Sequence, residues 1–102
     1  MITKNNVDAT ATVTELIPQI ILNNIIDAVN FCEKMVDNPD YLFVINLSTI
    51  NSEIQVLEIK TEQPKTNNVM YLNNIPPEDM RTEKIWVIRE NDYYVIMLPQ
   101  EY

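Results

Sequence analysis

The segment from Ile85 to Leu98 decides the fold, and it reads IWVIRE-ND-YYVIML. Two mainly apolar runs flank Asn91-Asp92, and Asn and Asp are the non-glycine residues that best accept the positive φ angles of a two-residue hairpin turn. The pattern therefore predicts a β-hairpin whose second strand ends at Pro99. The expected cross-strand pairs are Trp86 with Met97, Val87 with Ile96, Ile88 with Val95, and Arg89 with Tyr94.

Both faces of this predicted hairpin are apolar, although an antiparallel sheet with one covered face normally alternates between apolar and polar side chains. One face would carry Trp86, Ile88, Tyr93, Val95 and Met97, and the other Ile85, Val87, Tyr94, Ile96 and Leu98. A single helix can cover only one of them. The second face therefore requires another cover, either the N-terminal arm with the proline loop (Ile75 and Met80) or a partner.

The strongest helix signal lies upstream, from Glu15 to Asp37. Apolar residues recur there at helical spacing, at Ile21, Ile25, Ala28, Cys32 and Met35. Thr14 is the expected N-cap, and Pro18 falls in the first turn, where a helix tolerates proline. The helix is expected to end before Pro39, because proline disfavours helical backbone in the residue that precedes it.

Three further strands are predicted before the hairpin: Tyr41–Leu47, Ile54–Lys60 and Val69–Leu72, with a bulge between Val56 and Leu57 where the alternation slips. The predicted fold class is α+β, with one long N-terminal helix packed on a four- to five-stranded, mainly antiparallel sheet that ends in the C-terminal hairpin. At 102 residues the chain has room for a single domain, residues 1–102, in which residues 1–13 form a loose arm or an edge segment.

The composition removes most kinds of catalytic and cofactor site. The chain has no histidine, the usual general base and zinc ligand, and no glycine, which phosphate-binding loops require. Its one cysteine, Cys32, lies on the apolar stripe of the predicted helix and has no histidine to activate it. We therefore expect no enzyme activity, no cofactor and no metal site.

The formal net charge of −8 indicates which kinds of partner the chain can bind. The chain has no basic run and no basic helix face, so it lacks the phosphate-neutralising surface of a nucleic-acid binder, and attraction to an anionic membrane is disfavoured for the same reason. A basic protein partner is favoured, because opposite charges speed encounter. A cytoplasmic location is expected from the absence of a secretory signal and of an apolar segment long enough to span a bilayer.

Two groups of acidic residues invite a functional interpretation. They are Glu33, Asp37 and Asp40, and Glu78, Asp79 and Glu83. The first group has the oxygen ligands that a divalent cation prefers, but a solvated helix end followed by a turn explains it better. The second follows two prolines and would suit a stiff recognition loop, which loses little entropy on binding, although an ordinary charged surface loop is the simpler interpretation.

These observations predict a small acidic, non-catalytic binding module. We expect a neutraliser or inhibitor of immunity, antitoxin or anti-defence type that acts on a basic, nucleic-acid-handling protein, with carboxylates standing where phosphates would bind and aromatic rings as anchors. The predicted partner-binding residues are Glu78, Asp79, Glu83, Glu90, Asp92, Trp86, Tyr93 and Tyr94. The alternative is a homo-oligomeric structural or assembly protein, viral or accessory, that forms a homodimer through its second sheet face.

Overall fold

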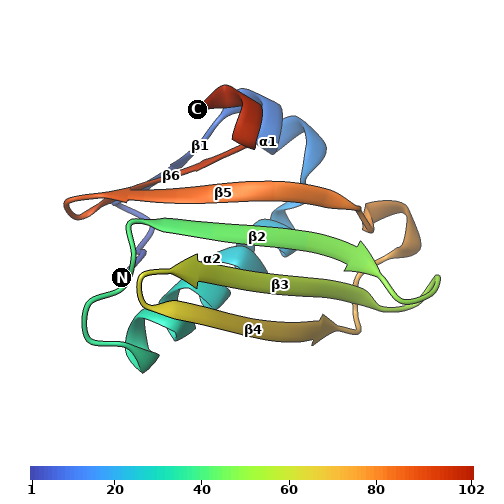
Figure 1. The fold of residues 1–102 in the computed structure, drawn as a ribbon. Coiled ribbons are helices and arrows are strands. Elements are labelled where there is room, and N and C mark those ends of the chain that lie inside the picture. Colours follow the sequence, from blue (N-terminus) through green and yellow to red (C-terminus); the bar gives the residue numbers. More distant parts are fainter.

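The computed structural model describes residues 1–102 and contains a six-stranded sheet with a helix packed across one face (Figure 1). The strand order is β1-β6-β5-β2-β3-β4. The elements are β1 (Val7–Ala9), α1 (Ala11–Leu16), α2 (Gln19–Met35), β2 (Leu42–Thr49), β3 (Gln55–Glu62), β4 (Lys65–Leu72), η1 (Pro77–Asp79), β5 (Glu83–Glu90), β6 (Tyr93–Met97) and η2 (Pro99–Glu101). The α+β class is confirmed, but the sheet is larger than the four to five strands expected.

The additional strand is β1, which pairs in parallel with β6 at one edge of the sheet and aligns Val7 with Tyr94. All other neighbouring strands are antiparallel. A strand of three residues is too short to give an alternating pattern that the sequence can reveal. β4 is also longer than expected and begins at Lys65 rather than Val69, because the turn at Gln63-Pro64 leads directly from β3 into it.

The C-terminal hairpin is confirmed in its strands, in the position of its two-residue turn and in its register. All four expected pairs form, and Glu90 also pairs with Tyr93. Asn91 has a φ of 58°, in the left-handed region that asparagine accepts more readily than most residues, whereas Asp92 does not adopt the positive φ expected for it. Because β5 also pairs with β2, and β6 with β1, both hairpin strands lie inside the sheet.

The single long helix expected from the sequence is wrong, because the segment forms two helices, α1 and α2. Ile17 has φ −111° and ψ 118°, an extended conformation that the ring of the following proline favours over the helical one. Pro18 is therefore the N-cap of α2. The N-cap of α1 is Thr10, not Thr14, and its hydroxyl accepts a hydrogen bond from the backbone N–H of Val13 at 3.3 Å. No helix combines the length and the apolar character that a membrane crossing requires.

β3 runs without the bulge expected between Val56 and Leu57, since pairing with β2 continues through both positions. The slip in the sequence pattern comes from Gln55, a polar residue at a core-facing position that is fully buried. Its Nε2 donates hydrogen bonds to the carbonyl oxygens of Ser48 and Arg81, and its Oε1 accepts one from the backbone N–H of Arg81. The buried carboxamide is therefore fully satisfied at this position.

The core lies between the helices and one face of the sheet, and a cluster of 21 buried apolar residues fills it. The N-terminal arm and the proline loop pack on this same side. Ile2 and Ile75 belong to the cluster, and Met80 packs against it. Neither segment therefore covers the opposite face of the sheet.

Candidate protein-binding surface

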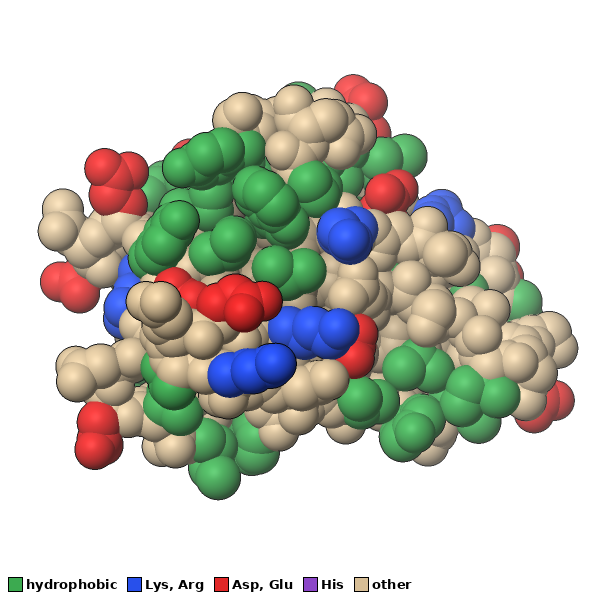
Figure 2. All heavy atoms as spheres, in the orientation of Figure 1, with side chains coloured by type: hydrophobic (Ala, Val, Ile, Leu, Met, Phe, Trp, Pro, Cys, Tyr) green, Lys and Arg blue, Asp and Glu red, His purple; other side chains and the backbone are tan.

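The sheet face opposite α2, which we call the open face, carries an apolar patch. The patch consists of two rows in register across β2, β5 and β6, Leu42–Ile88–Val95 and Val44–Trp86–Met97, with Tyr93 and Tyr102 beside them. The row residues are half-buried, and the two tyrosines are exposed. The ring of Tyr102 packs edge-to-face on Trp86 at 5.7 Å. Figure 2 views this face and shows hydrophobic side chains gathered over β5 and β6 with no helix in front of them.

An acidic rim, made of Asp8, Glu90 and Asp92, surrounds the hairpin end of the patch. A shallow hollow of about 330 Å³ lies there, lined by Ile88, Glu90, Asn91, Tyr93, Val95, Met97 and Tyr102. Asp8 stands beside Val95 in the register of β1 and β6. Its carboxylate accepts a hydrogen bond from the Tyr93 hydroxyl at 2.8 Å, which raises the pKa of Tyr93 above its ordinary value and fixes the ring at the rim. Apolar surface bordered by charge is the usual anatomy of a protein interface.

The part of the open face over the middle of β3 is polar. The side chain of Asn46 donates to Glu58 at 3.2 Å, and the ammonium group of Lys60 lies 3.8 Å from the same carboxylate. Lys84 stands opposite Asn46 in the register of β5 and β2. Lys60 and Lys84 therefore border the apolar patch on the sides away from the acidic rim, and Figure 2 shows basic side chains near the hydrophobic ones.

The structure divides the residues predicted to bind a partner. Trp86 and Tyr93 lie in the apolar patch, with Glu90 and Asp92 in its acidic rim. The three other acidic residues lie at the opposite end of β5: Glu83 is its first residue, and Glu78 and Asp79 lie in the loop that precedes it. Because β5 has eight residues, its ends are separated by about 23 Å. The two acidic groups therefore cannot act as one local site.

The loop that carries Glu78 and Asp79 is fixed by Arg81. Its Nε donates to the carbonyl oxygen of Leu16, and Nη1 donates to those of Glu78 and Met80, all at 2.9 Å. The backbone of Arg81 is also bonded on both sides by the Gln55 carboxamide. The stiffness expected from the two prolines therefore has a second, long-range source that sequence reasoning missed.

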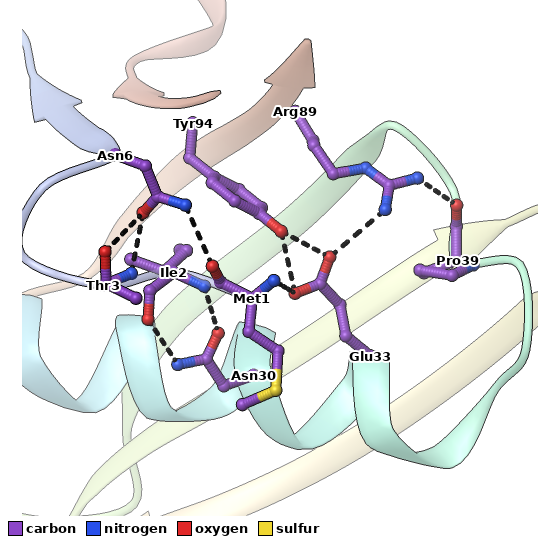
Figure 3. Close-up of polar contacts among 9 residues, drawn as sticks. All are labelled: Met1, Ile2, Thr3, Asn6, Asn30, Glu33, Pro39, Arg89 and Tyr94. Carbon is purple, nitrogen blue, oxygen red and sulfur yellow. Dashed lines mark hydrogen bonds and ion pairs between the residues drawn. The ribbon is translucent and has the colours of Figure 1, made fainter. Parts of the chain in front are cut away.

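Tyr94 is not a surface residue, and its prediction as an interface residue is wrong. It is 1% exposed and points toward the helices, because neighbouring residues of a strand face opposite sides of a sheet. Its hydroxyl lies 2.7 and 2.9 Å from the carboxylate oxygens of Glu33 (Figure 3). Burial, with the hydrogen bond and the negative charge of Glu33, raises the pKa of Tyr94 well above its ordinary value.

Glu33 is the centre of this buried cluster, although the sequence placed it in an acidic group at a solvated helix end. Its side chain is 5% exposed and pairs with the guanidinium of Arg89 at 3.4 Å and with the amino group of Met1 at 3.5 Å. Arg89 also donates to the carbonyl oxygen of Pro39 at 2.7 Å (Figure 3). The cluster therefore ties α2, β5 and β6 to the loop that follows α2.

Asp40, from the same predicted acidic group, accepts backbone hydrogen bonds from the β3–β4 turn and from the start of β2. Desolvation raises its pKa, but hydrogen bonds from the backbone N–H groups of Gln63, Glu62 and Tyr41 outweigh this, and the pKa of Asp40 lies below its ordinary value. Asp40 thus connects the start of β2 to the β3–β4 turn. No three histidine, cysteine or acidic residues converge in a way that could hold a metal ion.

We expect the buried state of Tyr94 to make the protein lose stability at alkaline pH. In the unfolded chain a tyrosine loses its proton at about pH 10, whereas Tyr94 in the folded protein keeps its proton to a higher pH because its pKa is raised. Above about pH 10 the native state therefore binds more protons than the unfolded state, and the free energy of unfolding falls as the pH rises. Urea titrations from pH 8 to 11 should show this fall in the wild type and a smaller one in Tyr94→Phe. The control Tyr71→Phe removes an exposed hydroxyl and should keep the wild-type fall; the same fall in Tyr94→Phe would contradict the assignment.

Comparison with known proteins supports the fold alone. No family model and no curated protein matches the chain. The crystal structure of a protein of unknown function from Enterococcus faecalis is similar, with a TM-score of 0.77 and 16% sequence identity, covering 98% of this chain and 93% of that chain. A likeness at this identity concerns the path of the chain and carries no information about a partner.

Sequence reasoning missed three members of the apolar patch, Leu42, Val44 and Tyr102. The β2 segment is so apolar that it looked buried on both faces. Its alternate positions are the available signal, since Leu42 and Val44 share one face at a spacing of two residues. Their position beside Ile88 and Trp86 follows only from the pairing of β2 with β5, which joins segments distant in sequence.

Proposed function

We propose that this chain is a non-catalytic, cytoplasmic protein-binding module whose open face contacts a basic protein. The proposal depends on one observation, the apolar patch that no other segment of the chain covers. The acidic rim of Asp8, Glu90 and Asp92 lies beside it. An uncovered apolar surface with charged neighbours is typical of interaction sites on small soluble domains.

The net charge of −8 supports a partner with a basic surface. Many basic surfaces bind the phosphates of nucleic acids, so a bound acidic protein would compete with the nucleic acid for them. This would make the chain a neutraliser or inhibitor of a nucleic-acid-handling protein, of immunity, antitoxin or anti-defence type. An interface of standard size needs about 800 Å² on each partner, roughly an eighth of the accessible surface of 6144 Å².

Reversing the charge of the acidic rim is expected to slow binding. With the partner captured from the native host, the double variant Glu90→Lys/Asp92→Lys should associate about tenfold more slowly than the wild type at low salt. The wild type itself should bind more weakly as the salt concentration rises. Surface plasmon resonance, with the chain immobilised, measures both rates.

The matched control is Glu78→Lys/Asp79→Lys, which changes the net charge equally at the other end of β5. We expect it to change the association rate by less than about twofold, because a local rim rather than the total charge steers the encounter. Equal slowing by the two double variants, or binding that does not respond to salt, would contradict the proposed surface.

A second candidate function, self-association as a structural or assembly protein, has its own observation. Lys60 and Lys84 lie on one side of the apolar patch, and the acidic rim lies on the opposite side. A two-fold axis through the patch would bring the lysines of one copy toward the carboxylates of the other. Light scattering decides this: a dimer that Val95→Lys dissociates would favour it, and a stable monomer removes it.

A further inference from the structure

The edge strand β4 is unprotected. It has eight residues, pairs only with β3, and makes no hydrogen bonds on its outer side. Proteins usually shield such an edge with a proline, a bulge, inward charges or a covering segment, because its free N–H and C=O groups attract other strands. β4 has a single charged residue, Lys65, at its first position. The other edge strand, β1, has only three residues.

A groove runs along this edge between α2 and β4. Two hollows lie in it. The first, of about 430 Å³, is lined by Asp27, Ala28, Phe31, Ile59, Asn68, Val69 and Met70. The second, of about 390 Å³, is lined by Ile20, Asn24, Tyr71, Leu72, Asn73, Asn74 and Ile75. The α2 contributions share one face of the helix and run from Ile20 to Phe31, and Figure 1 shows β4 at the lower edge of the sheet with α2 behind it.

The groove exposes apolar side chains that the core does not need. Phe31 is 49% exposed and Ile20 is 39% exposed, and both lie on the groove side of α2. Asp27 is exposed on the rim of the first hollow. These apolar groups and the free backbone edge are different features that lie along the same line.

We propose that β4 binds an extended peptide segment of another protein, which adds to the sheet as a seventh strand and places apolar side chains in the groove. The free backbone groups of β4 require an extended partner, since only a strand can satisfy a row of them. Side chains at every second position of that strand would face α2 and meet the two hollows. Asp27 favours a lysine or arginine at the flank of the segment.

The dimensions of the site suit a short segment. From Ile20 to Phe31 the helix rises by about 16 Å, which equals about five residues of extended strand. Two or three apolar side chains would therefore enter the groove, separated by single residues that face the other way. Those residues would lie beside Val69 and Tyr71, which are exposed on β4.

A second copy of this chain fits the edge less well than a peptide. The helix-facing side chains of its own β4, such as Met70 and Leu72, already pack against its own core, so they cannot fill the groove. A copy would also bring its own α2 to the same side of the sheet and its charge of −8 against an equal charge. The site is separate from the apolar patch on β2, β5 and β6 and does not depend on the proposed function.

The test is a selection from a displayed library of random ten-residue peptides on the immobilised full chain, with binding then measured on the synthetic winners. We expect the selected peptides to alternate apolar residues and to carry a lysine or arginine. Phe31→Asp should weaken their binding at least tenfold, whereas Tyr41→Asp, which changes an exposed aromatic residue outside the groove, should not. Asp27→Lys should remove the preference for a basic residue.

Two further measurements distinguish strand addition from ordinary apolar binding. Peptides methylated on the backbone nitrogens that face β4 should bind at least tenfold more weakly, because the methyl groups block the ladder. The amide resonances of β4 should shift on titration, while those of β5 and β6 stay in place. The proposal would be overturned if the peptides bound Phe31→Asp as tightly as the wild type, or if the methylated peptides bound as tightly as the unmethylated ones. A selection that yields no peptide, or a dimer joined through β4, would also overturn it. The Glu90→Lys/Asp92→Lys variant should bind these peptides like the wild type, so failure here and failure of the proposed function can be told apart.

Discussion

Glu33→Ala is expected to lower the free energy of unfolding by about 3 kcal/mol. The side chain of Glu33 is 5% exposed and accepts two contacts from the Tyr94 hydroxyl while pairing with Arg89. Without the carboxylate, a buried hydroxyl and part of a guanidinium lose their partner, and stranded polar groups cost more than the interaction itself contributed. Arg89 is 28% exposed and keeps its bond to Pro39, which holds the loss below the upper range for buried ion pairs.

Urea denaturation at neutral pH measures this loss, and two variants define its cause. Glu33→Gln keeps the volume and an acceptor oxygen but removes the charge, so we expect a smaller loss of about 1 to 2 kcal/mol. Lys34→Ala changes the adjacent, exposed residue of α2 and should stay within about 0.5 kcal/mol. A Glu33→Ala loss no larger than that of Lys34→Ala would show that the cluster does not stabilise the fold.

The sequence predicted those parts of the fold in which the information is local. The Asn91-Asp92 turn fixes the pairing of the residues beside it, so the register from Trp86 to Tyr94 was predictable. The break at Ile17 was predictable too, because the restriction that Pro18 places on it is a local one, but the apolar periodicity on both sides obscured it. For β1 the sequence offered only two alternatives over residues 1–13, a loose arm or an edge segment, because the bounds and parallel pairing of the strand depend on a partner that folding brings to it.

The candidate site was predictable only in part, for a related reason. Alternation in the hairpin placed Trp86 and Tyr93 on one face, and the structure leaves that face uncovered. The same alternation puts Tyr94 on the other face, so its choice as an anchor conflicted with the pattern itself. The sequence could not supply the distance between the two acidic groups. Glu78 and Glu90 both belong to acidic segments near β5, but they lie at its opposite ends.

The second large effect is expected at Gln55, where Gln55→Ala should lower the free energy of unfolding by about 3 kcal/mol. Gln55 is fully buried, and its carboxamide bonds the N–H and the carbonyl of Arg81 at 2.7 and 2.8 Å as well as the carbonyl of Ser48. Alanine would leave these three backbone groups without partners and a cavity beside them. Gln55→Met keeps most of the volume and loses only the hydrogen bonds, so the difference between the two variants measures the cavity.

The same variant tests whether the order of the acidic loop matters for binding. Arg81 holds that loop through its bonds to Leu16 and Glu78, and Gln55 holds the backbone of Arg81. In Gln55→Ala, hydrogen exchange should speed up at the amides of Asp79 and its neighbours, while the exposed control Gln63→Ala should leave exchange and stability unchanged within about 0.5 kcal/mol. If the acidic rim at the other end of β5 makes the contact, partner affinity should survive this loosening under conditions where the variant stays folded. If Gln55→Ala instead loses affinity for the partner, the interface lies at the acidic loop and not at the acidic rim, because the substitution loosens only the loop.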